Sequence, residues 1–195
     1  MNALFFLVLI ATGLSMQYSN PDNPVISFPI AVKMHNIGGI GLSLNYLVFL
    51  VGNAVSGNGK QYRLVMKGLG KRLRQQLHHY LIGIFKKEEP PFPVTEARKF
   101  NPLQAVSYAM AMYVGLPVLM ITGWGLLFPE TVVKSFSGFG GILLTDLLHV
   151  ITGFIMSVFM IVHIYMCTIG TKPGSNFRSM ITGWHEGHQG ETDKV

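Results

Sequence analysis

Long apolar stretches alternate with polar connections along this chain. A helix that crosses a bilayer needs about 17 to 25 residues, and stretches of that order lie at about residues 1–18, 30–53, 104–128 and 140–169. We therefore predict an all-α, integral membrane four-helix bundle that forms a single domain, residues 1–195. The connection 54–103 and the tail 170–195 are predicted to lie outside the bilayer.

The connection contains a second kind of pattern. In residues 71–85, KRLRQQLHHYLIGIF, apolar residues recur at helical spacing at Leu73, Leu77, Tyr80, Leu81 and Ile84. One face is then apolar and the other basic, which predicts an amphipathic helix along the lipid headgroups or against a partner. His78 and His79 fall outside this stripe, so we expect them to be ordinary solvated or interfacial histidines.

Composition supports a membrane protein, and charge adds an orientation. The chain is 49% hydrophobic and 12% charged, with a mean hydropathy of +0.40, which is too apolar for an ordinary soluble domain. Of the 15 Lys and Arg residues, ten lie in the connection and three in the tail. By the positive-inside rule, the connection and both termini are cytoplasmic. The net charge of +6 is thus topological and needs no nucleic acid to explain it.

Two histidines of the last stretch are candidates for chemistry. His149 and His163 are 14 residues apart, which in a helix corresponds to roughly four turns and about 21 Å, so both lie on one face. The stripe between them contains Gly153, Met156 and Met160. An ionisable residue in a spanning helix is costly and indicates function. The alternative is two histidines that are hydrogen-bonded to neighbouring helices.

Axial ligation of haem iron suits this pattern, because imidazole is a common haem ligand. The chain has no Cys-x-x-Cys-His, so the haem would be b-type. His35 lies near the outer end of the second stretch, at the depth of His149, and the two are predicted to bind an outer haem. Small residues nearby would let a porphyrin approach the backbone, although close helix packing explains them equally well; they are Gly38, Gly39 and Gly41.

His163 is predicted to bind an inner haem, but its partner is harder to find. The position 14 residues after His35 is Phe49, and the third stretch contains no histidine. The first stretch begins apolar, without the basic region of a signal peptide, and is predicted to be a spanning helix. We expect the fourth ligand just upstream of residue 1. Two haems are expected, or one if that ligand is absent.

A family resemblance becomes specific at this point. The order NALFFLVLIATGL, KMHNIGGIG, RKFNPLQ, LLHVITGF, IVHIYM and NFRSMITGWHE resembles the dihaem cytochrome b subunits of formate dehydrogenases and thiosulfate reductases. The resemblance implies an outer haem on His35 and His149, an inner haem using His163, and Asn101 and Gln104 at a menaquinone or ubiquinone site. It also implies a bacterial inner membrane and, as partners, a periplasmic iron-sulfur subunit and a molybdenum or tungsten catalytic subunit.

The resulting hypothesis is a membrane anchor subunit that passes electrons between quinone and a periplasmic oxidoreductase. No acid-base or nucleophilic constellation occurs in the chain, so substrate catalysis is expected in a partner subunit. The alternative is a small transporter or proton-relay subunit that uses its intramembrane histidines. That alternative expects charged residues along a polar path, and the spanning stretches offer little beyond Asp146.

Several of these residues also have purely structural interpretations. Asn101 and Pro102 form a plausible N-cap and first-turn pair for the third helix, and Gln104 could extend its amide to the interface. Basic residues near the spans could pair with haem propionates or simply set the topology; they are Lys33, Arg98 and Lys99.

Overall fold

The computed structural model describes residues 2–20, 22–93 and 100–168. The predicted tail 170–195, Arg98 and Lys99 therefore lie outside the described residues. Close contacts divide the chain into two units, residues 1–153 and 154–195, and we describe each by itself. The single-domain interpretation stays a prediction.

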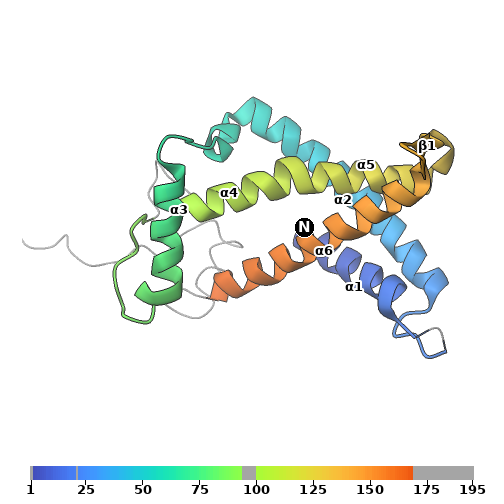
Figure 1. Ribbon diagram of the computed structural model, residues 1–195, viewed down its shortest axis with the longest axis horizontal. Coiled ribbons are helices and arrows are strands. Elements are labelled where there is room, and N and C mark those ends of the chain that lie inside the picture. The colour runs from blue at the N-terminus through green and yellow to red at the C-terminus, as the bar shows by residue number, and fades with distance from the viewer. Residues whose placement is uncertain (1, 21, 94–99, 169–195) are drawn as a thin grey trace, which may run out of the picture. The chain divides into compact units, whose positions relative to one another are not determined.

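Helices make up most of the described chain (Figure 1). The α-helices are α1 (Asn2–Tyr18), α2 (Phe28–Ser56), α3 (Leu69–His78), α4 (Pro102–Met110), α5 (Leu116–Leu127) and α6 (Gly141–Thr168). Short 3-10 turns, η1 (Asn58–Tyr62) and η4 (Pro129–Thr131), and π-helical turns, η2 (His79–Gly83) and η3 (Ala111–Gly115), extend or connect them.

Among the described residues, three helices are long and apolar enough to cross a membrane: Phe28–Ser56, Pro102–Leu127 and Gly141–Thr168. Their large apolar side chains are mostly exposed, for example Val48 at 69% and Ile121 at 73%, as expected for surfaces that face lipid. The helix α1 is apolar but shorter. The prediction of a helical membrane protein is thus confirmed, whereas the four-helix bundle stays a prediction.

The spanning helix Pro102–Leu127 begins at a capping box. The Asn101 side chain accepts a hydrogen bond from the backbone N–H of Gln104 at 2.9 Å, and the Gln104 side chain accepts one from the backbone N–H of Asn101 at 3.2 Å. Pro102 follows at the first helical position, where its missing N–H costs nothing. The predicted N-cap is therefore confirmed.

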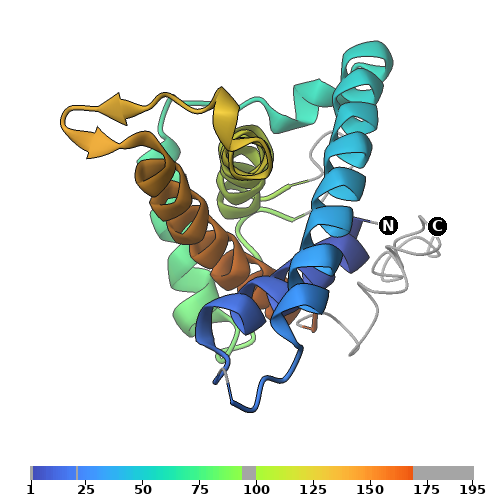
Figure 2. The same ribbon diagram turned by 90° about the vertical axis from the view of Figure 1, so that its right-hand side faces the viewer.

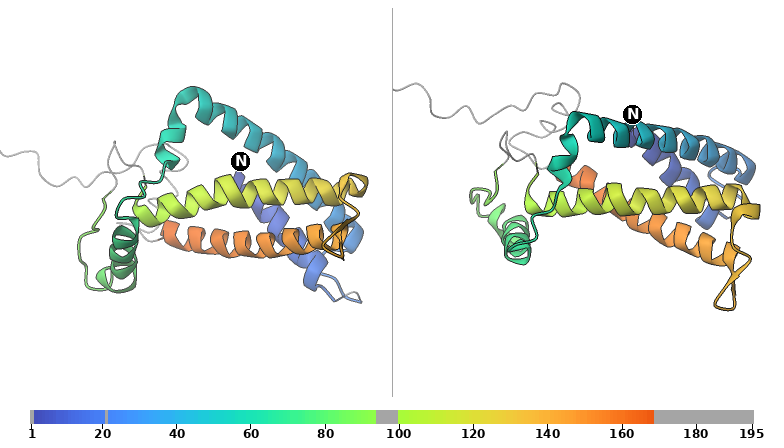
Figure 3. Two further views of the ribbon diagram at one scale, coloured as in Figure 1. Left: turned by 45° about the horizontal axis from the view of Figure 1, so that its top comes forward. Right: turned by 90° about the horizontal axis from the view of Figure 1, so that it is seen from above.

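This spanning helix runs through α4, η3 and α5 along one axis (Figure 3). Side chains of α2 hold it at two levels: the Tyr46 hydroxyl donates to the Met112 carbonyl at 2.7 Å, and the Trp124 indole N–H donates to Ser43 Oγ at 3.2 Å. Met112 lies in the π-helical turn η3, where the backbone hydrogen-bond pattern changes. These bonds join α2 to the spanning helix Pro102–Leu127.

The helices α1 and α2 pack closely, side by side (Figures 1 and 2). A Cβ atom added at Gly38 would lie 3.4 Å from the Leu9 side chain, and one added at Gly41 only 2.5 Å from the Phe5 ring. Gly38 and Gly41 therefore serve close helix packing, and the structure gives no support for their predicted role in porphyrin approach. Gly39 has nothing within 4 Å of its added Cβ atom.

Replacing Gly41 should test this packing. We expect Gly41→Ala to lower the free energy of unfolding by about 1 to 3 kcal/mol, because the methyl group would overlap the Phe5 ring. The control is Gly52→Ala in the same helix, where an added Cβ atom has nothing within 4 Å and should stabilise by about 0.5 to 1 kcal/mol. Thermal unfolding in detergent, followed by circular dichroism, measures both, and equal midpoints would contradict the packing role.

The connection contains the expected helix, formed by α3 and η2. Gln76 is 2% exposed and His79 is 8% exposed, whereas Leu77 and Leu81 are largely exposed. His79 is therefore not solvated, because the polar side of this helix is the side that packs on protein; an interfacial position of the two histidines stays a prediction. The exposed leucines suit a helix at a lipid surface, which stays a prediction.

A short hairpin joins the last two spanning helices (Figure 2). Its strands, β1 (Ser135–Phe136) and β2 (Phe139–Gly140), pair antiparallel, so the all-α prediction missed one minimal sheet. Ser137 and Gly138 form the turn with φ values of 50° and 84°. Positive φ at both positions is the requirement of a tight hairpin turn, and Ser-Gly suits it.

Candidate haem site

The structure brings His35 and His149 together. His35 is on α2 and His149 on α6, both within the unit 1–153. Their ring centres are 6.2 Å apart and the ring planes meet at 71°. Both side chains are half-buried. The pair was predicted from sequence to lie at one depth, and the geometry agrees with that expectation.

A threonine from a neighbouring helix contacts Nδ1 of each imidazole. His35 Nδ1 lies 2.9 Å from Thr12 Oγ1 of α1, and His149 Nδ1 lies 2.8 Å from Thr122 Oγ1 of α5. These two threonines are 1% and 5% exposed. One helix pair, α1 with α2, thus repeats the contact made by the other, α5 with α6.

The direction of these hydrogen bonds follows from the partners of the hydroxyl groups. Thr12 Oγ1 donates to the Val8 carbonyl at 2.7 Å, and Thr122 Oγ1 donates to the Val118 carbonyl at 2.7 Å. A hydroxyl has one proton to donate, so towards the imidazole it can only accept. Nδ1 of each histidine therefore carries the proton, and the lone pair is on Nε2.

Glycines beside the threonines let the helices approach the rings. A Cβ atom added at Gly13 would lie 3.4 Å from His35 Cε1, and one added at Gly123 would lie 3.2 Å from His149 Cε1. An added methyl group would press on the imidazole at Gly123 and would touch it at ordinary contact distance at Gly13. Each ring is therefore held between a hydroxyl group and the backbone of the next residue.

His35 and His149 would together hold the iron of one haem, because their ring centres lie only 6.2 Å apart although they come from two different helices. Within the described residues, Nε2 of His35 and of His149 has no hydrogen-bond partner. The residues present therefore fit a b-type haem, which would supply one-electron transfer.

Sequence reasoning missed Thr12 and Thr122. Both precede glycine, and a Thr-Gly pair close to each histidine is a visible signal. The signal is weak, however, because Thr-Gly also occurs at 152–153 and 182–183. Only the helix packing distinguishes the pairs that contact the two rings.

His163 belongs to the unit 154–195 and is described within it. Its ring stacks on Phe159, with centres 5.9 Å apart and planes 12° apart. Cys167, one turn later, places its sulfur 3.9 Å from His163 Nε2. The role of His163 in a second haem stays a prediction.

Phe49, at the position where a second histidine of α2 would be expected, belongs to an aromatic cluster. Its ring lies 5.9 Å from Tyr46, 5.7 Å from Tyr62 and 6.3 Å from Tyr113, measured between ring centres. Phe100 continues the cluster beyond Tyr62 at 5.7 Å. This end of α2 is thus filled by rings that pack on one another.

A polar cluster lies where α3 meets the start of α4. Asn101 is 7% exposed, and its amide donates to the Tyr80 hydroxyl at 2.7 Å. Burial raises the pKa of Tyr80, opposed by hydrogen bonds from Asn101 and Gln76, so the phenol is neutral at physiological pH. Within the described residues, Gln76 Oε1 is buried without a hydrogen-bond partner. The predicted quinone residues Asn101 and Gln104 therefore sit beside Tyr80 and Gln76.

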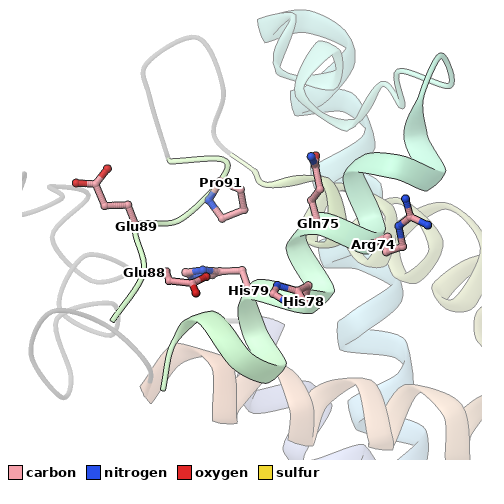
Figure 4. A pocket seen from close by; sticks show the side chains of 7 residues that line it. All are labelled: Arg74, Gln75, His78, His79, Glu88, Glu89 and Pro91. Carbon is pink, nitrogen blue, oxygen red and sulfur yellow. The ribbon is translucent and has the colours of Figure 1, made fainter. Parts of the chain in front are cut away.

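A pocket of 390 Å³ lies on another side of the same connection (Figure 4). It is lined by Arg74, Gln75, His78, His79, Glu88, Glu89 and Pro91. Despite these side chains, the described residues contain no group of three or more His, Cys, Asp or Glu that could hold a metal ion. The pocket therefore offers no alternative metal centre to the histidine pair.

Two comparisons with known proteins show the family of this chain. The family model described as prokaryotic cytochrome b561 matches residues 1–183. A protein of Escherichia coli (strain K12) named "Putative cytochrome YdhU" is 39% identical over 184 residues, which cover 94% of this chain and 69% of that protein. No solved structure matches significantly. The chain therefore belongs to the prokaryotic cytochrome b561 family and is a haem b protein of membrane electron transfer.

Proposed function

We propose that this chain is the membrane anchor subunit of an oxidoreductase complex and passes electrons between the quinone pool and a periplasmic partner. His35 and His149 are the axial ligands of its first haem. One observation carries this assignment: the two ring centres lie 6.2 Å apart, and a buried threonine contacts Nδ1 of each ring. Within its family, the chain is proposed to be of the formate dehydrogenase and thiosulfate reductase type.

His163 is proposed as a ligand of a second b haem. It is an intramembrane imidazole on the helix that also carries His149, and such a residue is costly unless it has a function. Two haems at different depths would let electrons cross the bilayer in one-electron steps.

The quinone is proposed to bind at the cluster of Asn101, Gln104 and Tyr80. The Tyr80 oxygen accepts a hydrogen bond from the Asn101 amide, so its own proton can be donated to a quinone carbonyl. Gln76 Oε1, buried and unpaired among the described residues, could accept from a quinol hydroxyl. Unpaired buried acceptors are uncommon, which supports a polar ligand here.

The proposed orientation places the connection, both termini and the quinone site on the cytoplasmic side of a bacterial inner membrane. It rests on the ten basic residues of the connection. The proposed partners are then a periplasmic iron-sulfur subunit and, bound to it, a molybdenum or tungsten catalytic subunit.

A reduced-minus-oxidised visible spectrum of the purified chain tests this function. We expect b-haem bands, with one or two haems per chain by pyridine haemochrome assay; two would support the second haem at His163. A colourless protein, after expression with ample porphyrin supply, would instead favour a proton-relay or transport subunit.

A further inference from the structure

Thr12 and Thr122 each make the same two contacts, one with an imidazole Nδ1 and one with a main-chain carbonyl. Helix packing alone would not require the contacts of the two threonines to be the same. The two hydroxyl-to-Nδ1 distances are 2.9 and 2.8 Å, and the two hydroxyl-to-carbonyl distances are both 2.7 Å. The two threonines come from different helices, α1 and α5. Equal chains of hydrogen bonds thus run from a backbone carbonyl, through a hydroxyl, to each imidazole.

We infer that Thr12 and Thr122 are positioning residues that set the reduction potential of the iron held by His35 and His149. This inference rests on the proposed function, because it requires the two histidines to be axial ligands. A group that accepts the Nδ1 proton fixes the tautomer and ring orientation and makes the coordinating nitrogen a stronger donor. A stronger donor stabilises ferric over ferrous iron and so lowers the reduction potential.

A hydroxyl is a moderate acceptor for this purpose. A hydrogen bond to a charged carboxylate is roughly twice as strong as one to a neutral group, so a carboxylate would lower the potential further. Removal of a group that only supports a metal ligand typically weakens metal binding by about 10- to 100-fold and does not remove the ligand itself. The haem should therefore stay bound when the threonine hydroxyl is removed.

The test uses Thr12→Val and Thr122→Val, which keep the side-chain shape and remove the hydroxyl. In a spectroelectrochemical titration of the purified chain, each should raise the midpoint potential. The expected change in the ferric-to-ferrous equilibrium is about tenfold, in line with the size of such support effects, which is about 59 mV for one electron. Thr12→Ser and Thr122→Ser keep the hydroxyl and should therefore have the midpoint potential of the unsubstituted chain.

The matched control is Thr145→Val. Thr145 lies one turn before His149, and its hydroxyl donates to the Gly141 carbonyl at 2.9 Å, like the other two threonines. Because it has no described contact with either histidine, its loss should leave the potential unchanged. Both single variants should shift the midpoint potential of the same haem, since one iron would receive both ligands. The midpoint potential of the double variant should shift about twice as far as that of either single variant.

The outcomes of these experiments distinguish an error in this inference from an error in the proposed function. If alanine variants of His35 and His149 lose haem but the valine variants leave the potential unchanged, the threonine inference is wrong and the function stands. If those alanine variants keep full haem, the function itself is wrong. Should a valine variant fail to fold, Thr12→Cys and Thr122→Cys replace it, because a thiol is a weaker acceptor of similar size; an unchanged potential there would also overturn the inference.

Discussion

Replacing either His35 or His149 by alanine should remove one b haem from the chain. Both rings would bind the same iron, because their centres are 6.2 Å apart, so loss of either ligand opens the same site. The effect should exceed the roughly 10- to 100-fold loss of affinity that follows removal of a group that only supports a ligand. Pyridine haemochrome assay should show a decrease of one haem per chain in each variant.

The two variants should be equivalent, which makes the prediction specific. If His35 and His149 bound separate irons, the double variant would lose twice as much haem as either single variant. For a shared iron, the double variant should lose no more than each single one. The second substitution removes nothing further, because loss of the first ligand has already emptied the site.

The control is His78→Ala. His78 is an exposed histidine of α3, outside the spanning helices, so its removal should leave the haem content unchanged. Electron transfer to quinone should stop in the His35 and His149 variants and continue in the control. Full haem content in either single variant would contradict the pairing.

The histidine pair could be predicted from the sequence because its depth depends on only a few physical constraints. Helical periodicity and the length of a span determine the depth of a residue in a membrane helix, and charge asymmetry determines the direction of each helix. Together they place His35 and His149 at one depth. The capping role of Asn101 was also predictable, since it depends only on neighbouring residues.

Other features depend on which helix faces meet, and these the sequence left open. Gly38 and Gly41 contact α1, but equally small residues could have faced a porphyrin. Thr12 and Thr122 were missed because the Thr-Gly pair occurs elsewhere in the chain. His79 was expected to be solvated or interfacial because it lies outside the apolar stripe, whereas the polar face of this helix packs on protein.

Replacing Asn101 by serine should slow quinone reduction or quinol oxidation and leave the b-haem spectrum intact. Serine can still cap α4, but its short side chain cannot reach the Tyr80 hydroxyl, which Asn101 contacts at 2.7 Å. A buried polar group left unpaired costs about 1 to 3 kcal/mol, so we expect turnover with a soluble quinone analogue to fall roughly 10- to 100-fold. Tyr80→Phe should have an effect of similar size.

A second asparagine provides a matched control for this loss. The Asn53 amide donates to the Tyr113 hydroxyl at 3.4 Å, beside the aromatic cluster, so Asn53→Ser removes the same chemical group from the same kind of partner. It should leave quinone kinetics nearly unchanged, because the longer bond contributes little. If both serine variants slow turnover equally, general loosening of the helices explains the effect; if neither does, the quinone binds elsewhere. A defect confined to Asn101 and Tyr80 would assign proton donation to this cluster, since Tyr80 is neutral and keeps its proton available at physiological pH.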